Sequence, residues 1–268
     1  MRAAVRTVWV LARAGFRRYS TYRLATLAGI LTNSVFGLIR GSIMLAAVAA
    51  AGGTVAGYSS AQASSFVWWG QGLIACVGLF GWTEVSDRVR SGDIAVDFAR
   101  PLDPQVAYLG ADLGRAALQL LTRGVPTVAI GALLFGIAPP RSAGVAALAV
   151  VSVVLAVVIS FGCRYAVNLA AFWLLENRGP QLVYIVVSGL LAGLYVPVAW
   201  FPPWLATLAA CTPFPSMLQT PIDLLGGRAD PAEAVRLLAD QLAWAGGALL
   251  LGQALTRRGR RVLEVQGG

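Results

Sequence analysis

The stretch AGVAALAVVSVVLAVVISFG, residues 143–162, runs for twenty residues without a charged side chain. A helix needs about twenty consecutive apolar residues to cross the hydrocarbon core of a membrane. The whole chain has the same character, because 57% of its 268 residues are hydrophobic and only 12% are charged. This is about half the charge expected of a soluble domain. The sequence therefore predicts an integral membrane protein.

Further apolar runs on both sides of this stretch predict an all-α bundle of six transmembrane helices. The predicted spans are 24–49, 64–83, 114–137, 144–173, 180–199 and 234–256. They form a single transmembrane domain over residues 1–268, made of an interfacial helix (1–23), the six-span bundle (24–256) and a cytoplasmic tail (257–268).

The arginines predict the orientation of the bundle, since all 21 basic residues are Arg and cytoplasmic connections are rich in them. The N-terminal segment, the connections after the second and fourth spans, and the tail together carry fourteen. The alternate connections hold only Arg141 and Arg228. Both termini are therefore expected in the cytoplasm, which requires an even number of spans.

The N-terminal segment has the pattern of an amphipathic helix. Arg2, Arg6, Arg13 and Arg17 gather on one side of a helical wheel, and apolar residues cover most of the other. Such a helix lies in the membrane interface with its arginines toward anionic lipid head groups. The alternative is that these arginines only flank the cytoplasmic end of the first span and form no interfacial helix.

A proline-rich apolar segment, VPVAWFPPWLATLAACTPFPSMLQTPIDLLGG, separates the last two predicted spans. Its six prolines divide it into pieces that are too short to cross a membrane. We expect two short helices that enter the outer leaflet as a re-entrant hairpin, with Trp200 and Trp204 at the interface. A simple external loop is the alternative.

The sequence lacks the residues and motifs that metal binding, ATP binding and most acid–base catalysis need. The chain has no His and no GxxxxGK[ST] phosphate loop, and its three cysteines are far apart. We therefore expect a non-catalytic chain that binds no metal, cofactor or nucleic acid. The carboxylates lie in connections and at span ends, which argues against a proton-coupled carrier.

Polar and aromatic residues inside the predicted spans are the candidates for a substrate path. An Arg facing lipid at mid-membrane costs about 2.5–3.5 kcal/mol, so these arginines should face protein, water or head groups. Structural pairing or snorkelling is the alternative for the arginines, and an interfacial aromatic belt is the alternative for the tryptophans. The candidate residues are Arg40, Trp68, Trp69, Gln71, Arg164 and Tyr165, and Arg123 is a further intramembrane arginine.

The stretch GWTEVSDRVRSGDIAVDFARPLDP, residues 81–104, holds five of the twelve carboxylates. We expect the second span to continue as a short cytoplasmic helix stabilised by Glu84–Arg88 and Asp87–Arg90 pairs and stopped at Gly92. The following IAVDFARPLDP alternates apolar and polar residues, and its prolines prevent further helix. Such a segment suits docking into a groove on another protein.

These features together resemble the membrane subunit of type-2 ABC exporters, the ABC-2 permease superfamily, in the branch that includes viologen-exporter permeases. The matching pieces span the chain, in the order that the family shows. They are the YR of TYRLATLAGI, the E…SGDIAVDFARPLDP stretch, AFWLLE at the end of the fourth span, VPVAWFPPWL…TPFPSMLQTPIDLLGG and the tail RRGRRVLEVQGG.

The resemblance implies a multi-pass permease of the bacterial cell membrane that works with a separate ATP-binding subunit, which carries the ATP and Mg. It implies a partner permease, identical or related, and a coupling helix between the second and third spans. The residues expected to couple to the ATPase are Glu84, Asp87, Arg88, Arg90, Gly92, Asp93, Arg100 and Pro101. The expected cargo is a hydrophobic or amphipathic compound such as a drug, antibiotic or lipid.

A second hypothesis is an integral membrane enzyme acting on lipid-linked substrates. Its arginines would bind phosphate, and Asp87, Asp93 and Asp97 are the only clustered candidates for a nucleophile or base. Activity of the purified chain without nucleotide would favour this hypothesis.

Overall fold

A computed structural model describes residues 2–21, 23–174 and 176–262 of the chain. The described chain is mostly helical. The long helices, together with the short turns η1 and η2 that continue α6 and α8, are α1 (Arg2–Ser20), α2 (Arg23–Ala50), α3 (Ser60–Val77), α6 (Pro104–Gln119), η1 (Leu120–Gly124), α7 (Val125–Phe135), α8 (Ala143–Leu169), η2 (Ala170–Phe172), α9 (Arg178–Leu191) and α12 (Pro231–Val262). The predicted all-α class is confirmed. Tyr22 of the YR pair, Leu175 of AFWLLE and tail residues 263–268 lie outside the described residues.

Four helical segments of the described chain are long and apolar enough to cross a membrane. They are Leu24–Ala50, Pro104–Phe135, Ala143–Phe172 and Pro231–Val262. The other two predicted spans correspond to α3 and α9, and the 14 residues of α9 extend only about 21 Å. The count of six spans therefore stays a prediction.

Three predicted boundaries need correction. The second span ends at Val77 and not near Thr83, because Gly78 adopts a left-handed conformation (φ 71°). The fifth helix ends at Leu191 and not at 199, ahead of Gly193 with φ 78°. The last helix continues through Val262, so the described part of the predicted tail is helical.

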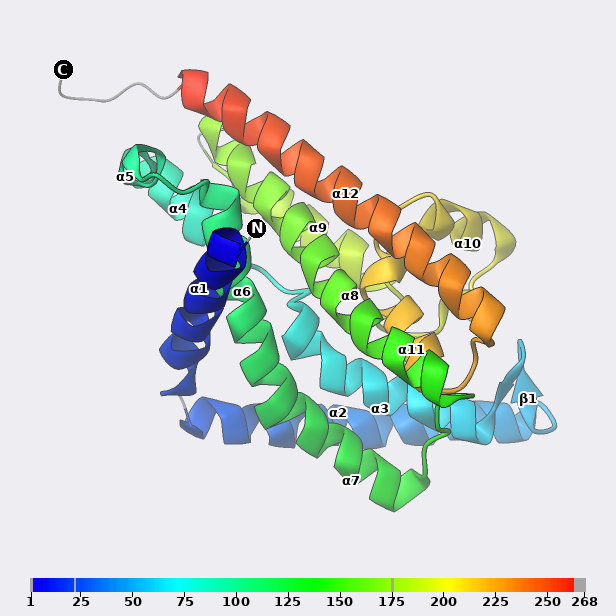
Figure 1. Cartoon of the computed structure of the whole chain (residues 1–268). Coiled ribbons are helices and arrows are strands. Elements are labelled where there is room, and N and C mark those ends of the chain that lie inside the picture. The colour runs from blue at the N-terminus through cyan, green and yellow to red at the C-terminus, as the bar shows by residue number, and fades with distance from the viewer. Residues whose placement is uncertain (1, 22, 175, 263–268) are drawn as a thin grey trace.

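The long helices cross one another in a bundle (Figure 1). In it α8 and α12 lie side by side along their length, and α6 with α7 crosses α2. The short helices α4 (Glu84–Ser91) and α5 (Ile94–Ala99) lie at one end with the C-terminal end of α12, and the strands β1 (Thr54–Val55) and β2 (Tyr58–Ser59) lie at the other. Trp68 of α3 is fully buried, and a Cβ added at Gly37 of α2 or at Gly131 of α7 would overlap its ring. These glycines let three helices close around one indole.

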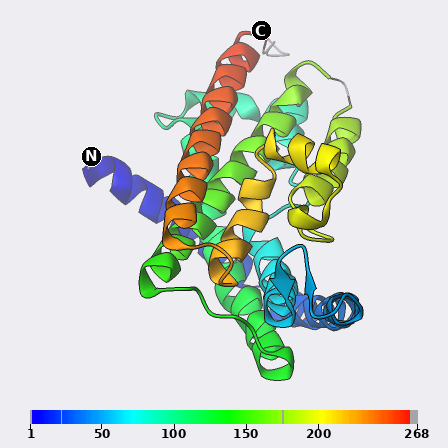
Figure 2. The same cartoon turned by 90° about the vertical axis from the view of Figure 1, so that its right-hand side faces the viewer.

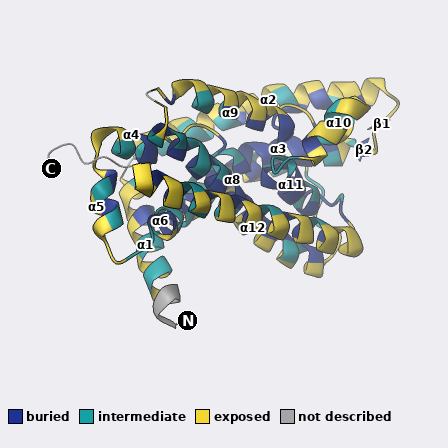
Figure 3. Cartoon of the chain, turned by 90° about the horizontal axis from the view of Figure 1, so that it is seen from above, coloured by how far each residue is buried: buried dark blue, intermediate teal, exposed yellow. Residues whose placement is uncertain are grey.

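The outer faces of the bundle are apolar. Figure 3 shows buried residues concentrated on α3 and α8, and exposed residues along α2, α9 and α12. Large hydrophobic side chains are prominent among the exposed residues, including Leu24, Leu31, Ile43, Leu182, Val186 and Leu250. Contiguous apolar surface of this kind requires a cover of lipid or protein, as expected of a membrane bundle.

The proline-rich segment folds into short pieces, as predicted. They are η3 (Val198–Trp200), α10 (Pro203–Ala210), η4 (Pro215–Met217) and α11 (Gln219–Leu225). Figure 2 shows α9 and α10 on the same side of α12. The indole N–H of Trp200 donates to the carbonyl oxygen of Val55 at 3.2 Å, whereas Trp204 is 69% exposed. Entry of these helices into the membrane stays a prediction.

A polar cluster holds this segment to the strand hairpin. The Gln219 amide donates to both carboxylate oxygens of Asp223 and to the Tyr58 hydroxyl, each at 2.9 Å. Arg228 pairs with Asp223 at 3.2 Å, and its guanidinium lies 3.6 Å from the centre of the Tyr58 ring. Burial raises the pKa of Asp223 to about 6, although Gln219 and Arg228 oppose the shift.

The stability of the folded protein is therefore expected to fall as the pH rises through about 6. A carboxyl whose pKa is raised in the folded state binds its proton more tightly there than in the unfolded chain. Its contribution is greatest below the usual value near 3.8 and amounts to about 3 kcal/mol. Thermal unfolding across this pH range measures the effect, and Asp223→Asn, which cannot ionise, should remove it. An equal pH dependence in both proteins would contradict the prediction.

Candidate functional site on the α4–α5 hairpin

Two short helices, α4 and α5, form a hairpin between the second and third predicted spans. Gly92, with φ 81°, ends α4, and its N–H donates to the Val89 carbonyl oxygen at 3.3 Å. The predicted stop at Gly92 is confirmed. The expectation that no further helix follows it is wrong, because Ile94–Ala99 is helical. Ile94 and Phe98 are four residues apart, so a helix places both on its packed face.

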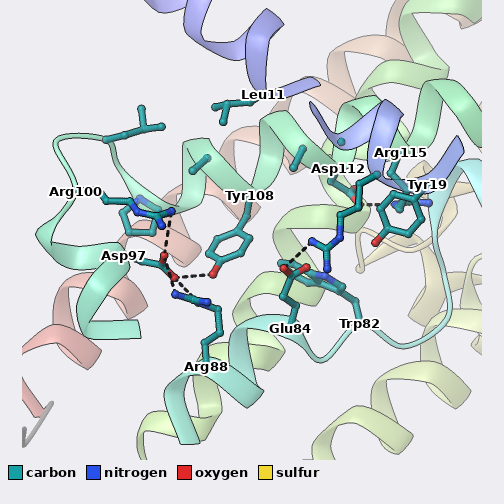
Figure 4. A pocket seen from close by; sticks show the side chains of 16 residues that line it. Leu11, Tyr19, Trp82, Glu84, Arg88, Asp97, Arg100, Tyr108, Asp112 and Arg115 are labelled. Atoms are coloured by element: carbon teal, nitrogen blue, oxygen red, sulfur yellow. Dashed lines mark hydrogen bonds and ion pairs between the residues drawn. The ribbon is translucent and has the colours of Figure 1, made fainter. Parts of the chain in front are cut away.

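Asp97 is the hub of this hairpin. Its buried carboxylate accepts two hydrogen bonds from Arg88, at 2.7 and 3.1 Å, and one from the Tyr108 hydroxyl at 2.7 Å. Arg100 lies 3.6 Å away on the solvent side. Figure 4 shows these side chains converging from α4, α5 and α6. The hydrogen bonds that Arg88 donates to Asp97 raise the pKa of Arg88, so Arg88 stays charged and fixes α4 against α5.

The predicted ion pairs within α4 are wrong among the described residues. Glu84 pairs with Arg18 of α1 at 2.9 Å, and Arg88 pairs with Asp97 of α5. Arg90 lies 3.7 Å from Glu176, which follows η2. Asp87 instead accepts a hydrogen bond from the Thr83 hydroxyl. The charges of α4 therefore connect it to other elements rather than stabilise it internally.

The inner face of the hairpin is anchored in the bundle. The Ser86 N–H donates to the Asn168 side-chain oxygen of α8 at 3.0 Å, and the Gln181 amide of α9 donates to the Ser86 hydroxyl at 3.2 Å. Ile94 is buried with Phe161 and other residues of α8, and Phe98 stacks on Phe172 at 6.2 Å.

The outer face of the hairpin is open. Val96 is 53% exposed, and Asp87, Arg90, Gly92 and Asp93 are exposed around it. Of the predicted coupling residues, Glu84 and Arg88 are half-buried and engaged in ion pairs. Arg100 is exposed at the chain's return to α6. Pro101 lies in the bend between α5 and α6. The hairpin therefore presents a rigid, mixed polar and apolar tip.

A cavity of about 270 Å³ lies behind the hairpin, between α1, α4, α5 and α6. Arg18, Glu84, Arg88, Asp97 and Arg115 are among its charged lining residues. Three aromatic residues, Tyr19, Trp82 and Tyr108, line it as well. Most of these charges are engaged with one another. The cavity is therefore a polar space between the α4–α5 hairpin and the helices α1 and α6.

Asp112 lies at the inner edge of this cavity and was not among the predicted site residues. Its carboxylate binds Arg115 of the same helix at 2.6 Å and Arg164 of α8 at 2.8 Å, and all three side chains are largely buried. Arg115 also donates to the carbonyl oxygens of Ala75 and Cys76 at the end of α3. This cluster therefore ties α3, α6 and α8 together where the chain leaves the second predicted span.

The residues predicted for the substrate path do not come together. Arg40 donates to the carbonyl oxygens of Leu194 and Tyr195 beyond α9. Trp68 is buried with its neighbour Gln71 in the middle of the bundle. Trp69 is partly buried, and Tyr165 donates to or accepts from Thr256 of α12 at 3.0 Å. None of the predicted path residues lines the cavity behind the hairpin, and their role in a path stays a prediction.

Comparison with known protein families gives a match. A family model described as ABC-2 family transporter protein matches residues 36–266, which is well over half of the chain. Comparison with individual curated proteins gives no match. The matched range includes the α4–α5 hairpin and the proline-rich segment.

Proposed function

The chain belongs to the ABC-2 transporter family, and we propose that it is the membrane permease subunit of an ATP-driven exporter whose ATP-binding subunit is a separate chain. The α4–α5 hairpin carries this proposal. Its inner face is anchored to α8 and α9, whereas its tip is exposed. A force applied to the tip by a partner would be transmitted directly to the long helices.

The path for the cargo is proposed to form between this chain and a second permease, identical or related. The apolar exposed faces of α2 and α9 support this arrangement, because they suit contact with protein or lipid. A hydrophobic or amphipathic cargo fits such surfaces. Both termini and the hairpin are proposed to face the cytoplasm of a bacterial cell, as the arginine distribution predicts.

The alternative of a lipid-modifying enzyme loses Asp97, one of its three candidate carboxylates. Its candidate Asp97 is buried and engaged by Arg88, Arg100 and Tyr108. A carboxylate held in this way is a structural hub, since a nucleophile or base must reach its substrate.

The proposal predicts that an ABC ATP-binding subunit co-purifies with the chain from its native membranes. Val96→Asp is expected to reduce the amount of that subunit about tenfold, because a charge replaces an exposed apolar contact at the hairpin tip. Quantitative mass spectrometry of the purified complex measures the ratio of the two subunits.

The matched control is Val235→Asp, since Val235 is 61% exposed near the start of α12, at the end away from the hairpin. This control should retain the ATP-binding subunit. The proposal fails if no such subunit co-purifies, if the isolated chain hydrolyses ATP, or if both variants retain the subunit equally.

A further inference from the structure

A second cavity, of about 340 Å³, lies where α1, α2 and the α6–η1 segment meet. It is separate from the cavity behind the hairpin, although Arg18 and Tyr19 line both. The complete lining is Arg18, Tyr19, Ala25, Thr26, Gln119 and Arg123. Two of these six residues are cationic, and none is acidic.

Arg123 has no carboxylate partner among the described residues. One of its nitrogens donates to the Ala25 carbonyl oxygen at 2.6 Å, and another lies 3.4 Å from the Gln119 side-chain oxygen. Its Nε atom is buried and makes no hydrogen bond within the described chain. Both acceptors are neutral, so the positive charge is solvated by dipoles only. An anion in the cavity would compensate that charge where a carboxylate is missing.

The local backbone presents Arg123 to α2. Residues 120–124 form a π-helical turn, η1, between α6 and α7. Such turns insert an extra residue into a helix and are frequent at functional sites. Gly29 of α2 faces the Arg123 side chain so closely that a Cβ there would overlap its guanidinium. The π-turn and the glycine together make room for a guanidinium between two membrane helices.

Apolar surface begins immediately beside the cavity. On α2, Leu24, Leu27 and Leu31 are 83%, 63% and 67% exposed. On the other side, Leu121 and Val125 are 60% and 53% exposed. A polar, cationic cavity that adjoins two apolar strips matches the chemistry of a phospholipid, with its phosphate in the cavity and its acyl chains along the leucines. A free phosphate would make no use of those strips.

We propose that this cavity binds the phosphate group of an anionic membrane phospholipid through Arg123, with Arg18 as the second cation. Guanidinium groups bind phosphate oxygens in pairs, which makes arginine well suited to this ligand. Arg18 also pairs with Glu84 of α4 at 2.9 Å. The lipid therefore lies one ion pair away from the hairpin.

The test measures binding of phosphatidylglycerol and phosphatidylcholine to the purified full-length chain in detergent by native mass spectrometry. The wild-type protein should bind phosphatidylglycerol about tenfold more tightly than phosphatidylcholine, and Arg123→Gln should weaken phosphatidylglycerol binding about tenfold. The control Arg178→Gln removes an exposed charge outside the cavity and should change binding less than about twofold.

A second variant protects the test against misfolding of Arg123→Gln. Ala25→Phe keeps both arginines and places a bulky side chain at the lining of the cavity, so it should also lose the preference for phosphatidylglycerol. Soluble glycerol 3-phosphate should fail to displace the lipid. The proposal is overturned if Ala25→Phe binds phosphatidylglycerol like the wild type. It is equally overturned if the two lipids bind equally to the wild type, or if glycerol 3-phosphate at equal concentration displaces the lipid.

Discussion

Replacement of Asp112 by Ala is expected to destabilise the folded protein by about 3–5 kcal/mol. The Asp112 carboxylate neutralises both Arg115 and Arg164, and the Arg164 side chain is only 4% exposed. Removal of the carboxylate leaves two buried guanidinium groups without a counter-charge. Thermal unfolding of the detergent-solubilised protein measures the loss.

The control for this change is Asp240→Ala, because the Asp240 side chain is 55% exposed and its pair with Arg236 is a surface pair. Its expected cost is below about 1 kcal/mol. Equal losses in the two variants would show that Asp112 does not hold the buried cluster together.

A double variant separates the buried charge from the packing around it. In Asp112→Leu with Arg164→Leu, one guanidinium is removed together with the carboxylate. Arg115 keeps its hydrogen bonds to the carbonyl oxygens of Ala75 and Cys76. The double variant should therefore be more stable than the sum of the two single losses predicts.

The long helices were predictable because a run of about twenty apolar residues indicates a helix that crosses the membrane. The first span was expected at 24–49 and is found as Arg23–Ala50, and the fourth was expected at 144–173 and is found as Ala143–Phe172. The fifth was misjudged because the sequence remains apolar after the helix has ended. Its end depends on the backbone at Gly193, which hydropathy does not detect.

The helix α5 shows the limit of pattern reading in short segments. Apolar residues at 94, 96 and 98 fit a strand period of two, and the pair at 94 and 98 also fits a helix. The tertiary contacts decide between them, since Ile94 and Phe98 pack on α8 and η2 while Val96 stays exposed. In a six-residue segment the sequence contains too few repeats to choose.

A short helix after the second predicted span was predictable, but the partners of its side chains were not, and its coupling role stays a prediction. The stretch from 81 to 104 was expected to carry the coupling residues, and the hairpin is found there. Arg164 pairs with Asp112, which is 52 residues away in the sequence. Arg40 donates to carbonyl oxygens more than 150 residues away. Backbone carbonyl groups occur at every position, so no sequence pattern marks the ones that an arginine will bind.

Replacement of Asp97 by Ala is expected to lower transport-coupled ATP hydrolysis of the assembled transporter about tenfold or more. The two charge-assisted hydrogen bonds from Arg88, together with the one from Tyr108, hold α4, α5 and α6 in one arrangement. Hydrogen bonds to charged groups contribute about 1.5–3 kcal/mol each, and 1.4 kcal/mol is a factor of ten in population. Cargo-stimulated ATP turnover of the complex in reconstituted membranes measures the effect.

Asp97→Asn keeps the shape and one acceptor oxygen, so it should retain more coupling than Asp97→Ala. Glu176→Ala is the matched control, because Glu176 is an exposed carboxylate at the same end of the molecule and lies 3.7 Å from Arg90. It should leave the stimulated rate near that of the wild type. If Asp97→Ala keeps full stimulation while the ATP-binding subunit remains bound, the Arg88–Asp97 pair does not transmit force. The anchored contacts of Ser86 with Asn168 and Gln181 would then have to carry the coupling alone.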